Sequence, residues 1–238
     1  MSLKQNVANA VAARVEDGQV IGLGSGSTVE LALEALGRRV ASERLRIAGV
    51  PTSLRIAQVA AQCGIEVLSP YPLLKLDWAF DGADEVDPQL NLIKGAGGAM
   101  LGEKIIARRA RTKFVIVVTE DKLVSRLGEK FAVPVEVIPD AQFDAMAQLT
   151  ELGAISVKPR ESAAKYGPTI SERGNVILDA TFECGAITNQ LEHQIKQCLG
   201  VVESGLFMGY ASEVLYAAET GVWCLKRESH GVSKSREA

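Results

Sequence analysis

Two aspartates, Asp81 and Asp84, come directly after a short apolar run that predicts a buried strand at 78–80. In open parallel sheets, ligands bind at the carboxyl ends of the strands, which is where these carboxylates are expected. Two carboxylates in one site raise the proton affinity of one of them, which suits acid or base chemistry. With Gly82 and Ala83 between the aspartates, the stretch also fits an exposed turn, so by itself it does not decide between the two interpretations.

A lysine followed by small residues comes next, and this combination suits a negatively charged oxygen. The run is Lys94-Gly95-Ala96-Gly97-Gly98, directly before a helix predicted over 98–109. Small residues leave backbone N–H groups able to point at an oxyanion, and Lys94 adds a positive charge. The run therefore predicts an oxyanion-binding loop.

Glu103 completes the set, about one and a half turns into the predicted helix. A lone glutamate at such a position would be a solvated surface residue. Proton transfer next to a carbonyl, however, needs a base, an acid and an oxyanion stabiliser, and the segment 81–103 holds all three kinds of group.

A glycine-rich loop predicts a phosphate site elsewhere in the chain. It spans 22–28 and joins a strand expected at 20–23 to a helix expected at 27–39. Glycines allow close approach of a ligand, and the start of a helix attracts an anion. The candidate ligands are Ser25, Gly26, Ser27 and Thr28. The alternative is a tight turn with an ordinary helix cap, because Ser27 and Glu30 have the capping-box spacing.

Two other nucleotide-loop types do not fit this stretch. The spacing is one residue short of the dinucleotide fingerprint, and the second strand ends at Val50-Pro51-Thr52 without an acidic residue for a ribose hydroxyl. No Gly-Lys-Ser/Thr follows, so it is not a P-loop either.

The charge balance argues against nucleic acid as a partner and leaves an anionic small molecule open. The net charge is -3 and the pI about 5.6. No apolar run approaches the roughly 20 residues of a membrane helix, so no membrane association is expected. The stretch 1–18 predicts an amphipathic helix rather than a signal peptide, which favours a cytoplasmic protein.

The cysteines and histidines predict neither a disulfide framework nor a metal site. Cys63, Cys184, Cys198 and Cys224 are widely spread without a CxxC pair, which favours buried free thiols in a reducing cytoplasm. His193 and His230 have no second histidine or cysteine pair nearby, so zinc is not expected.

Strand and helix patterns alternate through the first half and predict a parallel sheet with helices on both faces. After Leu127 the pattern changes to strands that pair through a turn, with two helices. The fold class expected is α/β, a Rossmann-like parallel-sheet domain with a smaller α+β (ferredoxin-like) domain. The expected bounds are 1–128 with 207–238 for the first domain and 129–206 for the second.

The detailed expectations in the second half include a helix starting at Pro139-Asp140 and a short strand at 169–171. A turn at 173–175 leads into a strand at 176–180. The polar tail from Lys226 is expected to be frayed.

Together these motifs resemble the type A ribose-5-phosphate isomerase family. The resemblance rests on Gly24-Ser25-Gly26-Ser27-Thr28, Asp81-Gly82-Ala83-Asp84, Lys94-Gly95-Ala96-Gly97 and Glu103. It continues through 113–122, 133–139 and 174–179 and covers nearly the whole chain in order. Each motif alone is weak, but the ordered set is specific.

The resemblance implies an isomerase that interconverts ribose 5-phosphate and ribulose 5-phosphate in the pentose phosphate pathway, without metal or organic cofactor. It implies that Glu103 is the base, and that Asp81, Asp84 and Lys94 assist ring opening and bind sugar hydroxyls. The 94–97 loop would hold the oxyanion. Ser25 to Thr28 would bind the phosphate with Lys122, and Lys4 is a further candidate. Family members are typically homodimers or homotetramers.

Two departures from the family pattern stand out. Ala96 interrupts a glycine run, which matters if that position needs a positive φ. The stretch from Tyr216, with Trp223 and Cys224, matches less well, so subunit contacts there could differ.

Two functions from other classes compete. A sugar-phosphate sensor of the transcription-regulator kind would need a DNA-binding segment, and the stretch before Val20 is too short for a helix-turn-helix. It would also have no need for Glu103. A coenzyme A transferase would use a glutamate nucleophile, but no second motif supports it.

Overall fold

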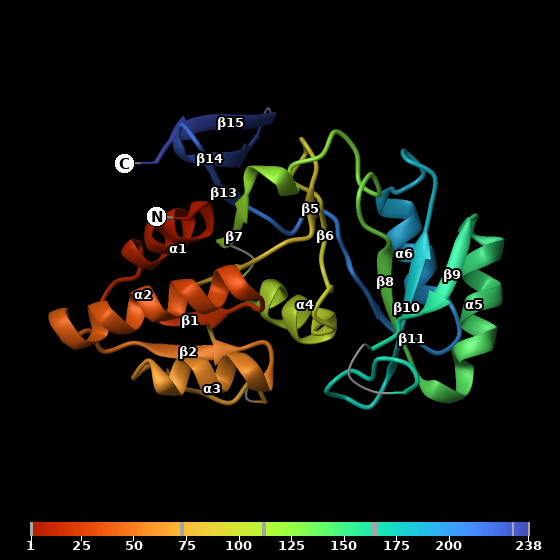
Figure 1. Cartoon of the computed structure of the whole chain (residues 1–238), viewed down its shortest axis with the longest axis horizontal. Coiled ribbons are helices and arrows are strands. Elements are labelled where there is room, and N and C mark those ends of the chain that lie inside the picture. Colours follow the sequence, from red (N-terminus) through yellow and green to blue (C-terminus); the bar gives the residue numbers. More distant parts are fainter. Residues whose placement is uncertain (1, 72–73, 111–112, 163–165, 230, 238) are drawn as a thin grey trace. The chain divides into compact units, whose positions relative to one another are not determined.

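The computed structural model describes residues 2–71, 74–110, 113–162, 166–229 and 231–237. The chain forms two compact units, shown in Figure 1. Unit 1 comprises Met1–Ala83, Gly102–Leu123 and Gly209–Ala238, and unit 2 comprises Asp84–Leu101 and Val124–Met208. This grouping places the 84–101 stretch in unit 2, whereas the sequence placed it in the first domain. The domain bounds expected from the sequence stay a prediction.

Unit 1 is built on an eight-stranded sheet in the order β15-β14-β13-β7-β4-β1-β2-β3. The strands from β13 to β3 are parallel, and β14 and β15 are antiparallel additions at one edge. The strands are β1 (Val20–Leu23), β2 (Ala48–Pro51), β3 (Glu66–Val67), β4 (Trp78–Asp81), β7 (Phe114–Thr119), β13 (Glu213–Ala218), β14 (Gly221–Glu228) and β15 (Gly231–Arg236). The parallel sheet expected from the alternating pattern is confirmed.

Apolar runs explain the central strands, because strands covered on both faces need no polar side. Every residue of β7 and β4 is buried. The helices of unit 1 are α1 (Leu3–Ala13), α2 (Ser27–Glu43), α3 (Leu54–Gln62) and, from Gly102 onward, α4 (Met100–Arg109), with a 3-10 turn at Glu120–Lys122. α1 packs on α2, β7 and β13. A Cβ at Gly22 would collide with Ile106 and Ala79, so α4 lies close against β1.

The start of α2 differs from the capping box expected at Ser27 and Glu30. The N-cap is Gly26, with a φ of 110° that favours glycine and without a side-chain cap bond. Glu30 instead accepts hydrogen bonds from Arg55, at 3.0 and 2.7 Å. The hydrogen bond from Arg55 lowers the pKa of Glu30. The capping-box prediction is therefore wrong, and the side chains of Ser25 and Ser27 do not cap this helix.

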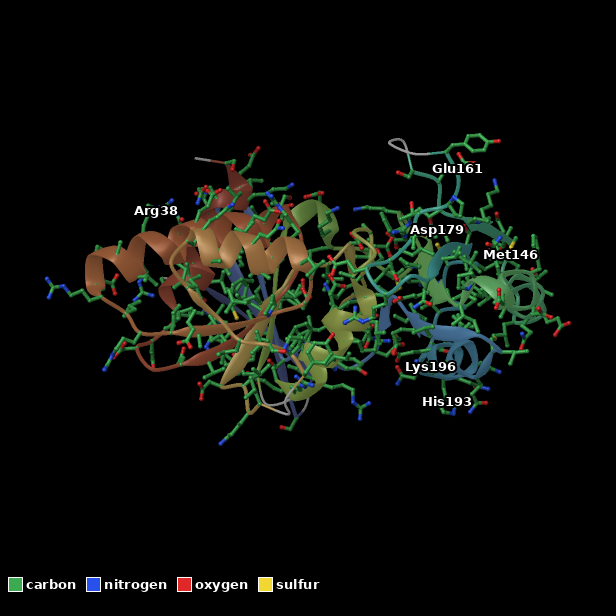
Figure 2. The ribbon with its side chains drawn as sticks, turned by 90° about the horizontal axis from the view of Figure 1, so that it is seen from below. Arg38, Met146, Glu161, Asp179, His193 and Lys196 are labelled. Carbon is green, nitrogen blue, oxygen red and sulfur yellow. The ribbon has the colours of Figure 1, made fainter. Side chains whose placement is uncertain are left out.

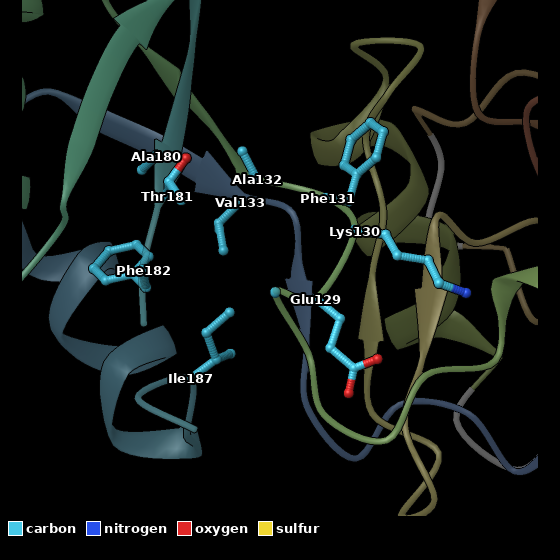
Figure 3. A pocket seen from close by; sticks show the side chains of 10 residues that line it. Glu129, Lys130, Phe131, Ala132, Val133, Ala180, Thr181, Phe182 and Ile187 are labelled. Carbon is cyan, nitrogen blue, oxygen red and sulfur yellow. The ribbon is translucent and has the colours of Figure 1, made fainter. Parts of the chain in front are cut away.

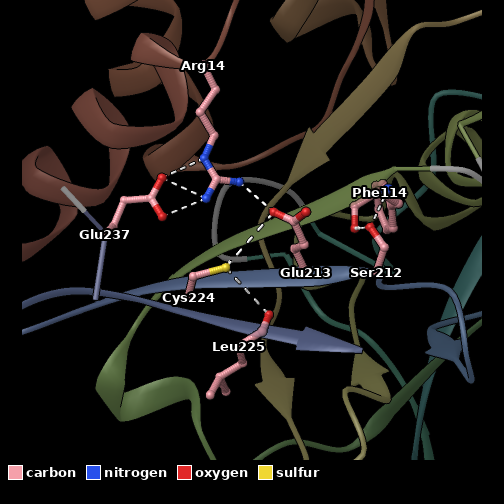
Figure 4. Close-up of polar contacts among 7 residues, drawn as sticks. All are labelled: Arg14, Phe114, Ser212, Glu213, Cys224, Leu225 and Glu237. Carbon is pink, nitrogen blue, oxygen red and sulfur yellow. Dashed lines mark hydrogen bonds and ion pairs between the residues drawn. The ribbon is translucent and has the colours of Figure 1, made fainter. Parts of the chain in front are cut away.

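Most of the described residues of the C-terminal tail form strands, contrary to the expectation of fraying from Lys226. β14 and β15 form an antiparallel pair, and Glu237 receives two hydrogen bonds from Arg14 on the chain after α1, both at 2.7 Å. Figure 4 shows Arg14 also donating to Glu213 at 2.6 Å, with the Cys224 thiol beside that carboxylate. Burial acts to lower the pKa of Arg14, but the hydrogen bonds to Glu237 and Glu213 raise it above its usual value. The polar residues from Lys226 therefore belong mainly to paired strands with exposed side chains, and not to a frayed end.

Unit 2 contains a four-stranded antiparallel sheet in the order β11-β8-β10-β9. Its elements follow as β8 (Val133–Val137), a 3-10 turn at Pro139–Ala141, α5 (Gln142–Glu151), β9 (Ser156–Pro159), β10 (Val176–Thr181), α6 (Asn189–Gln197) and β11 (Val201–Ser204). This β-α-β-β-α-β order with these neighbours is the ferredoxin-like arrangement, as expected. Thr188 caps α6 by accepting from the N–H of Leu191.

The strand expected at 169–171 is reduced to an isolated bridge between Ile170 and Val176. The reason is local: Ser171 turns the chain by accepting from the N–H groups of Arg173 and Asn175. Its hydroxyl donates at 2.6 Å to Glu136, a carboxylate buried in the sheet. The polar turn is thus tied to β8 instead of extending the sheet.

A small three-stranded sheet, β12-β6-β5, completes unit 2. It joins β5 (Glu85–Val86), β6 (Leu92–Ile93) and β12 (Leu206–Phe207). Glu85 is fully buried and accepts from the N–H groups of Gly128, Lys130 and Phe131, at 2.6, 2.5 and 2.6 Å. Its carboxylate therefore fixes the 128–131 loop beside the sheet.

Candidate functional site

In unit 1, polar residues follow the carboxyl ends of four neighbouring parallel strands. Thr52 follows β2, Ser25 lies just after β1, Asp81 ends β4, and Lys122 comes soon after β7. These strands are adjacent in the order β7-β4-β1-β2. Parallel strands end at the same edge, so these side chains share the edge at which ligands bind.

Asp81 is the best-defined group at this edge. It is 1% exposed, and its Oδ1 accepts from the N–H groups of Ser25 at 2.9 Å and Gly82 at 2.7 Å. The exposed turn that the DGAD pattern also allowed is therefore wrong for Asp81. The Gly24 backbone lies against the Asp81 carboxylate so closely that a Cβ at position 24 would collide with it. Glycine is required at position 24 by this approach.

The loop after β1 presents hydroxyl groups in a network. Ser25 Oγ lies 2.7 Å from Thr52 Oγ1 and donates to Ser53 Oγ at 3.2 Å. Ser27 Oγ accepts from the ammonium of Lys4 at 3.0 Å. Gly26 and Ser27 are exposed at the start of α2, where the helix dipole favours an anion. Hydroxyls, a lysine and a helix N-terminus together suit a phosphate group.

Lys122 and Thr28 complete this set in unit 1. Both are half-buried, and Lys122 makes no ion pair within the described residues. Lys122 follows β7, two strands from β1, with neighbouring strands about 4.8 Å apart. The backbone of Lys122 therefore lies near the edge of the sheet at which β1, β4 and β7 end.

Glu103 is the fourth residue of α4, not one and a half turns into it, because the helix begins at Met100 rather than Gly98. It is 4% exposed, so the interpretation as a solvated surface glutamate is wrong. Its place in the first turn puts a negative charge where the helix dipole stabilises it. The next residue, Lys104, is also buried and lies 5.8 Å from the ring centre of Tyr210.

In unit 2, Asp84 precedes β5 and Lys94 follows β6, so both lie at the same end of this antiparallel strand pair. Asp84 is half-buried, and its Oδ2 accepts from the N–H of Ala96 at 3.0 Å. Lys94 is 2% exposed, and its ammonium lies 5.6 Å from the ring centre of Phe207. Its N–H donates at 2.8 Å to Gly205, where a Cβ would collide with the Lys94 carbonyl oxygen. Asp84 and the small-residue loop are therefore brought together.

The small-residue loop is a tight turn. The φ values of Gly95 and Gly98 are 103° and 74°, and the N–H of Gly98 donates to the Gly95 oxygen at 3.0 Å. Ala96 does not have a positive φ, so alanine is compatible with the backbone at this position. Two N–H groups of this stretch are already used within the protein, because that of Ala96 donates to Asp84 and that of Gly98 to Gly95. The N–H groups of Gly95 and Gly97 have no hydrogen-bond partner in the described part of the chain.

Metal ligands and thiols do not gather at these residues. No cluster of three or more His, Cys, Asp or Glu side chains able to hold a metal occurs in the described ranges. His193 is exposed on α6 (Figure 2), and His230 lies outside the described residues. All four cysteines are free, but only Cys198 and Cys224 are buried; Cys63 is half-buried and Cys184 is exposed, so the expectation of buried thiols is wrong for these two.

A cavity of about 210 Å³ in unit 2 does not include any predicted site residue. Figure 3 shows it between the 128–133 loop, the end of β10 and Ile187. Its walls include the apolar side chains of Phe131, Val133 and Phe182. It lacks the converging carboxylates and donors that proton transfer requires.

Sequence reasoning missed Arg160 and Asp179 as neighbours of the loop at 95–97. Arg160 Nη1 donates to the carbonyl oxygens of Gly95 and Ala96, both at 2.8 Å. Asp179 holds the same guanidinium from the other side. Arg160 lies 64 positions from Ala96 and Asp179 lies farther along the chain, so no local pattern connects them to the loop.

The fold and the two groups of residues define a two-unit α/β protein equipped for acid–base chemistry on an anionic small molecule. Comparison with known proteins gives the family. The chain belongs to the ribose 5-phosphate isomerase A (phosphoriboisomerase A) family, whose model matches residues 48–221. In the described residues, no helix is both long and apolar enough to cross a membrane.

Individual relatives match along almost the whole chain. The chain is 44% identical to ribose-5-phosphate isomerase A of Methanothermobacter thermautotrophicus, over 95% of this chain and 98% of that protein. Ribose 5-phosphate isomerase A of Methanocaldococcus jannaschii superposes with a TM-score of 0.90 at 42% identity, covering 94% of this chain and 98% of the other. A D-ribose-5-phosphate isomerase solved with phospho-erythronic acid superposes with a TM-score of 0.91 at 38% identity, covering 94% of this chain and 98% of the other.

Proposed function

We propose that this protein interconverts D-ribose 5-phosphate and D-ribulose 5-phosphate, an aldose–ketose isomerisation of the non-oxidative pentose phosphate pathway. The observation that carries this proposal is the near-complete burial of two carboxylates, Asp81 and Glu103, in a chain of this family. Burying a charged group is costly unless the protein uses or compensates it. A structural glutamate on a helix surface would not need that burial.

Glu103 is the proposed base. In the open-chain aldose it takes the proton from C2, and the electrons move to the C1 carbonyl oxygen, which gives an enediolate. A proton then moves from the C2 hydroxyl to the C1 oxygen. The protonated Glu103 delivers its proton to C1, and the C2 carbonyl of the ketose forms. One base therefore serves both directions of the reaction.

The other groups have supporting roles. Asp81, Asp84 and Lys94 assist ring opening and bind the sugar hydroxyls. The loop of Gly95, Ala96 and Gly97 stabilises the enediolate oxygen, with the N–H of Gly97 as the donor best placed to do so, because Asp84 already holds that of Ala96. Gly82 and Ala83 line the substrate beside the aspartates.

The phosphate is held by the loop after β1. Ser25, Gly26, Ser27 and Thr28 supply hydroxyl and backbone donors at the start of α2, and Lys122 supplies charge. Lys4 adds a second charge, since its ammonium already lies 3.0 Å from Ser27 Oγ. A relative solved with phospho-erythronic acid supports a phosphorylated sugar acid as a ligand of this chain.

The protein is proposed to work in the cytoplasm as a homo-oligomer, with a dimer the first expectation and a tetramer the second. The four free cysteines fit a reducing compartment. Light scattering after size exclusion reports the oligomer directly: a mass near that of one chain, 25.4 kDa, would contradict this part of the proposal.

The test is turnover by purified, EDTA-treated protein supplied with ribose 5-phosphate. Formation of ribulose 5-phosphate supports the proposal. Binding of the sugar phosphate without turnover would favour the rival sensor class instead. Activity that depends entirely on added metal would contradict the metal-free mechanism.

A further inference from the structure

We propose that Arg160 is a positioning residue that aims the N–H of Gly97 at the reacting oxygen, a role that rests on the proposed isomerase function. The guanidinium donates to two successive carbonyl oxygens, those of Gly95 and Ala96, both at 2.8 Å. Its side chain is only 14% exposed. An arginine that holds two adjacent carbonyls fixes two adjacent peptide planes.

The direction of the Gly97 N–H follows from peptide geometry. The described peptide bonds are all trans, so each N–H points opposite to the C=O of the same plane. The plane between Ala96 and Gly97 presents its carbonyl to Arg160 and its N–H away from Arg160. The plane between Gly95 and Ala96 is held at both ends, by Arg160 at its oxygen and by Asp84 at its N–H, 3.0 Å away.

The guanidinium also strengthens the donor. A positive charge at a carbonyl oxygen draws electron density along the peptide, so the N–H of the same plane becomes more polar. That N–H has no hydrogen-bond partner in the described residues, and Gly97 is exposed, so a ligand oxygen can reach it. The peptide between Ala96 and Gly97 can therefore donate a hydrogen bond to an anionic ligand.

Asp179 orients Arg160 in turn. Its carboxylate on β10 (labelled in Figure 2) accepts two hydrogen bonds, from Nε at 3.0 Å and Nη2 at 2.5 Å. Such a fork-shaped pair fixes the plane of the guanidinium and leaves Nη1 for the loop. Asp179 on the ferredoxin-like sheet therefore orients Arg160, and Arg160 in turn orients the loop.

Unit 1 offers a matched control with the same geometry and no such loop. Arg39 pairs with both oxygens of Glu43 at 2.8 and 2.7 Å, and its Nη1 donates to the carbonyls of Ala12 and Val15 at 2.7 and 2.8 Å. Removing either arginine sacrifices the same number of bonds. A purely structural role for Arg160 therefore predicts equal consequences for Arg160→Met and Arg39→Met.

The experiment compares kcat, KM and melting temperature of the wild type, Arg160→Met and Arg39→Met, with Arg160→Gly assayed with and without added guanidinium. We expect Arg160→Met to lower kcat about 10- to 100-fold with KM changed less than about 3-fold, because the misplaced donor acts mainly in the transition state. Arg39→Met should keep kcat at temperatures where it is folded. Guanidinium should restore part of the activity of Arg160→Gly.

Three outcomes overturn the proposal. An active wild type with unchanged kcat in Arg160→Met refutes the role of Arg160 and leaves the isomerase function intact. Equal losses of kcat in the two methionine variants would show a structural effect alone. A wild type without turnover refutes the isomerase function, and the role of Arg160 falls with it.

Discussion

Replacing Gly24 by alanine tests the close approach of β1 to Asp81. A Cβ at position 24 would lie 2.5 Å from the Cα of Asp81 and closer still to its carboxylate, distances that real Cβ atoms do not show. Because a backbone atom is among those struck, rotating the Asp81 side chain cannot relieve the collision. The adjacent strands β1 and β4 must separate, or the carboxylate must leave its place beside the Ser25 N–H.

The expected size of the effect follows from overpacking in a closed core. Such insertions cost about 1–3 kcal/mol, and the backbone contact places this one near the upper end. In a chain of this length, 3 kcal/mol lowers the melting temperature by about 6–12 °C. Displacing a reacting carboxylate by about 1 Å costs about 100-fold in rate, so kcat should fall by that order even where the protein is folded.

The control is Gly37→Ala on α2. A Cβ there meets the carbonyl oxygen and Cβ of Cys63 at 2.8 Å, so it also crowds a neighbouring backbone, but away from Asp81. Both variants are assayed for isomerisation well below their melting temperatures. We expect both variants to lose stability and only Gly24→Ala to lose kcat. Normal kcat in folded Gly24→Ala would refute the positioning of Asp81 by this strand pair.

Two further predictions concern stability and thiol chemistry. Arg14→Met should lower the melting temperature by about 4–10 °C, because two partly buried carboxylates, those of Glu213 and Glu237, lose their partner; an unchanged melting curve would show that the C-terminal strand contributes no stability. Burial raises the pKa of the Cys224 and Cys198 thiols, so they stay protonated and slow at pH 7–8, and a chromogenic disulfide reagent should titrate exposed Cys184 first. Peptide mapping that finds Cys224 labelled before Cys184 in the folded protein would contradict this order.

Much of the fold could be predicted because its cause is local. The strand predicted at 78–80 is a continuous apolar run, which is typical of strands covered on both faces. The β-α-β-β-α-β order of unit 2 followed from element types and their sequence. β15 was missed although its partner β14 directly precedes it, because its six residues are all exposed and carry no pattern of buried apolar side chains.

The candidate site residues could be named from the sequence, but their arrangement could not. Asp81, Lys94 and Glu103 were predicted as site residues because their types and spacing suit proton transfer, and that assignment stays a prediction. The sequence could not predict which N–H groups of the loop lack a partner. That depends on the hydrogen bond from Ala96 to Asp84 and on the contact of Arg160, which is distant in the sequence, with the loop. The error at Ser27 has the same origin: a capping spacing says nothing about Gly26 taking the cap position instead.

The most direct test of the central claim is isotope exchange catalysed by Glu103. Wild-type protein, treated with EDTA, is incubated with ribose 5-phosphate in D₂O, and deuterium at C1 of ribulose 5-phosphate and C2 of ribose 5-phosphate is followed by NMR. A parallel sample contains Glu103→Gln, whose amide preserves the shape of the side chain but cannot take a proton.

We expect deuterium at these two carbons for the wild type. For Glu103→Gln we expect a loss of several orders of magnitude in both turnover and exchange, with sugar phosphate still bound. Exchange by Glu103→Gln at the wild-type rate would contradict the assignment of Glu103 as the base that moves the proton.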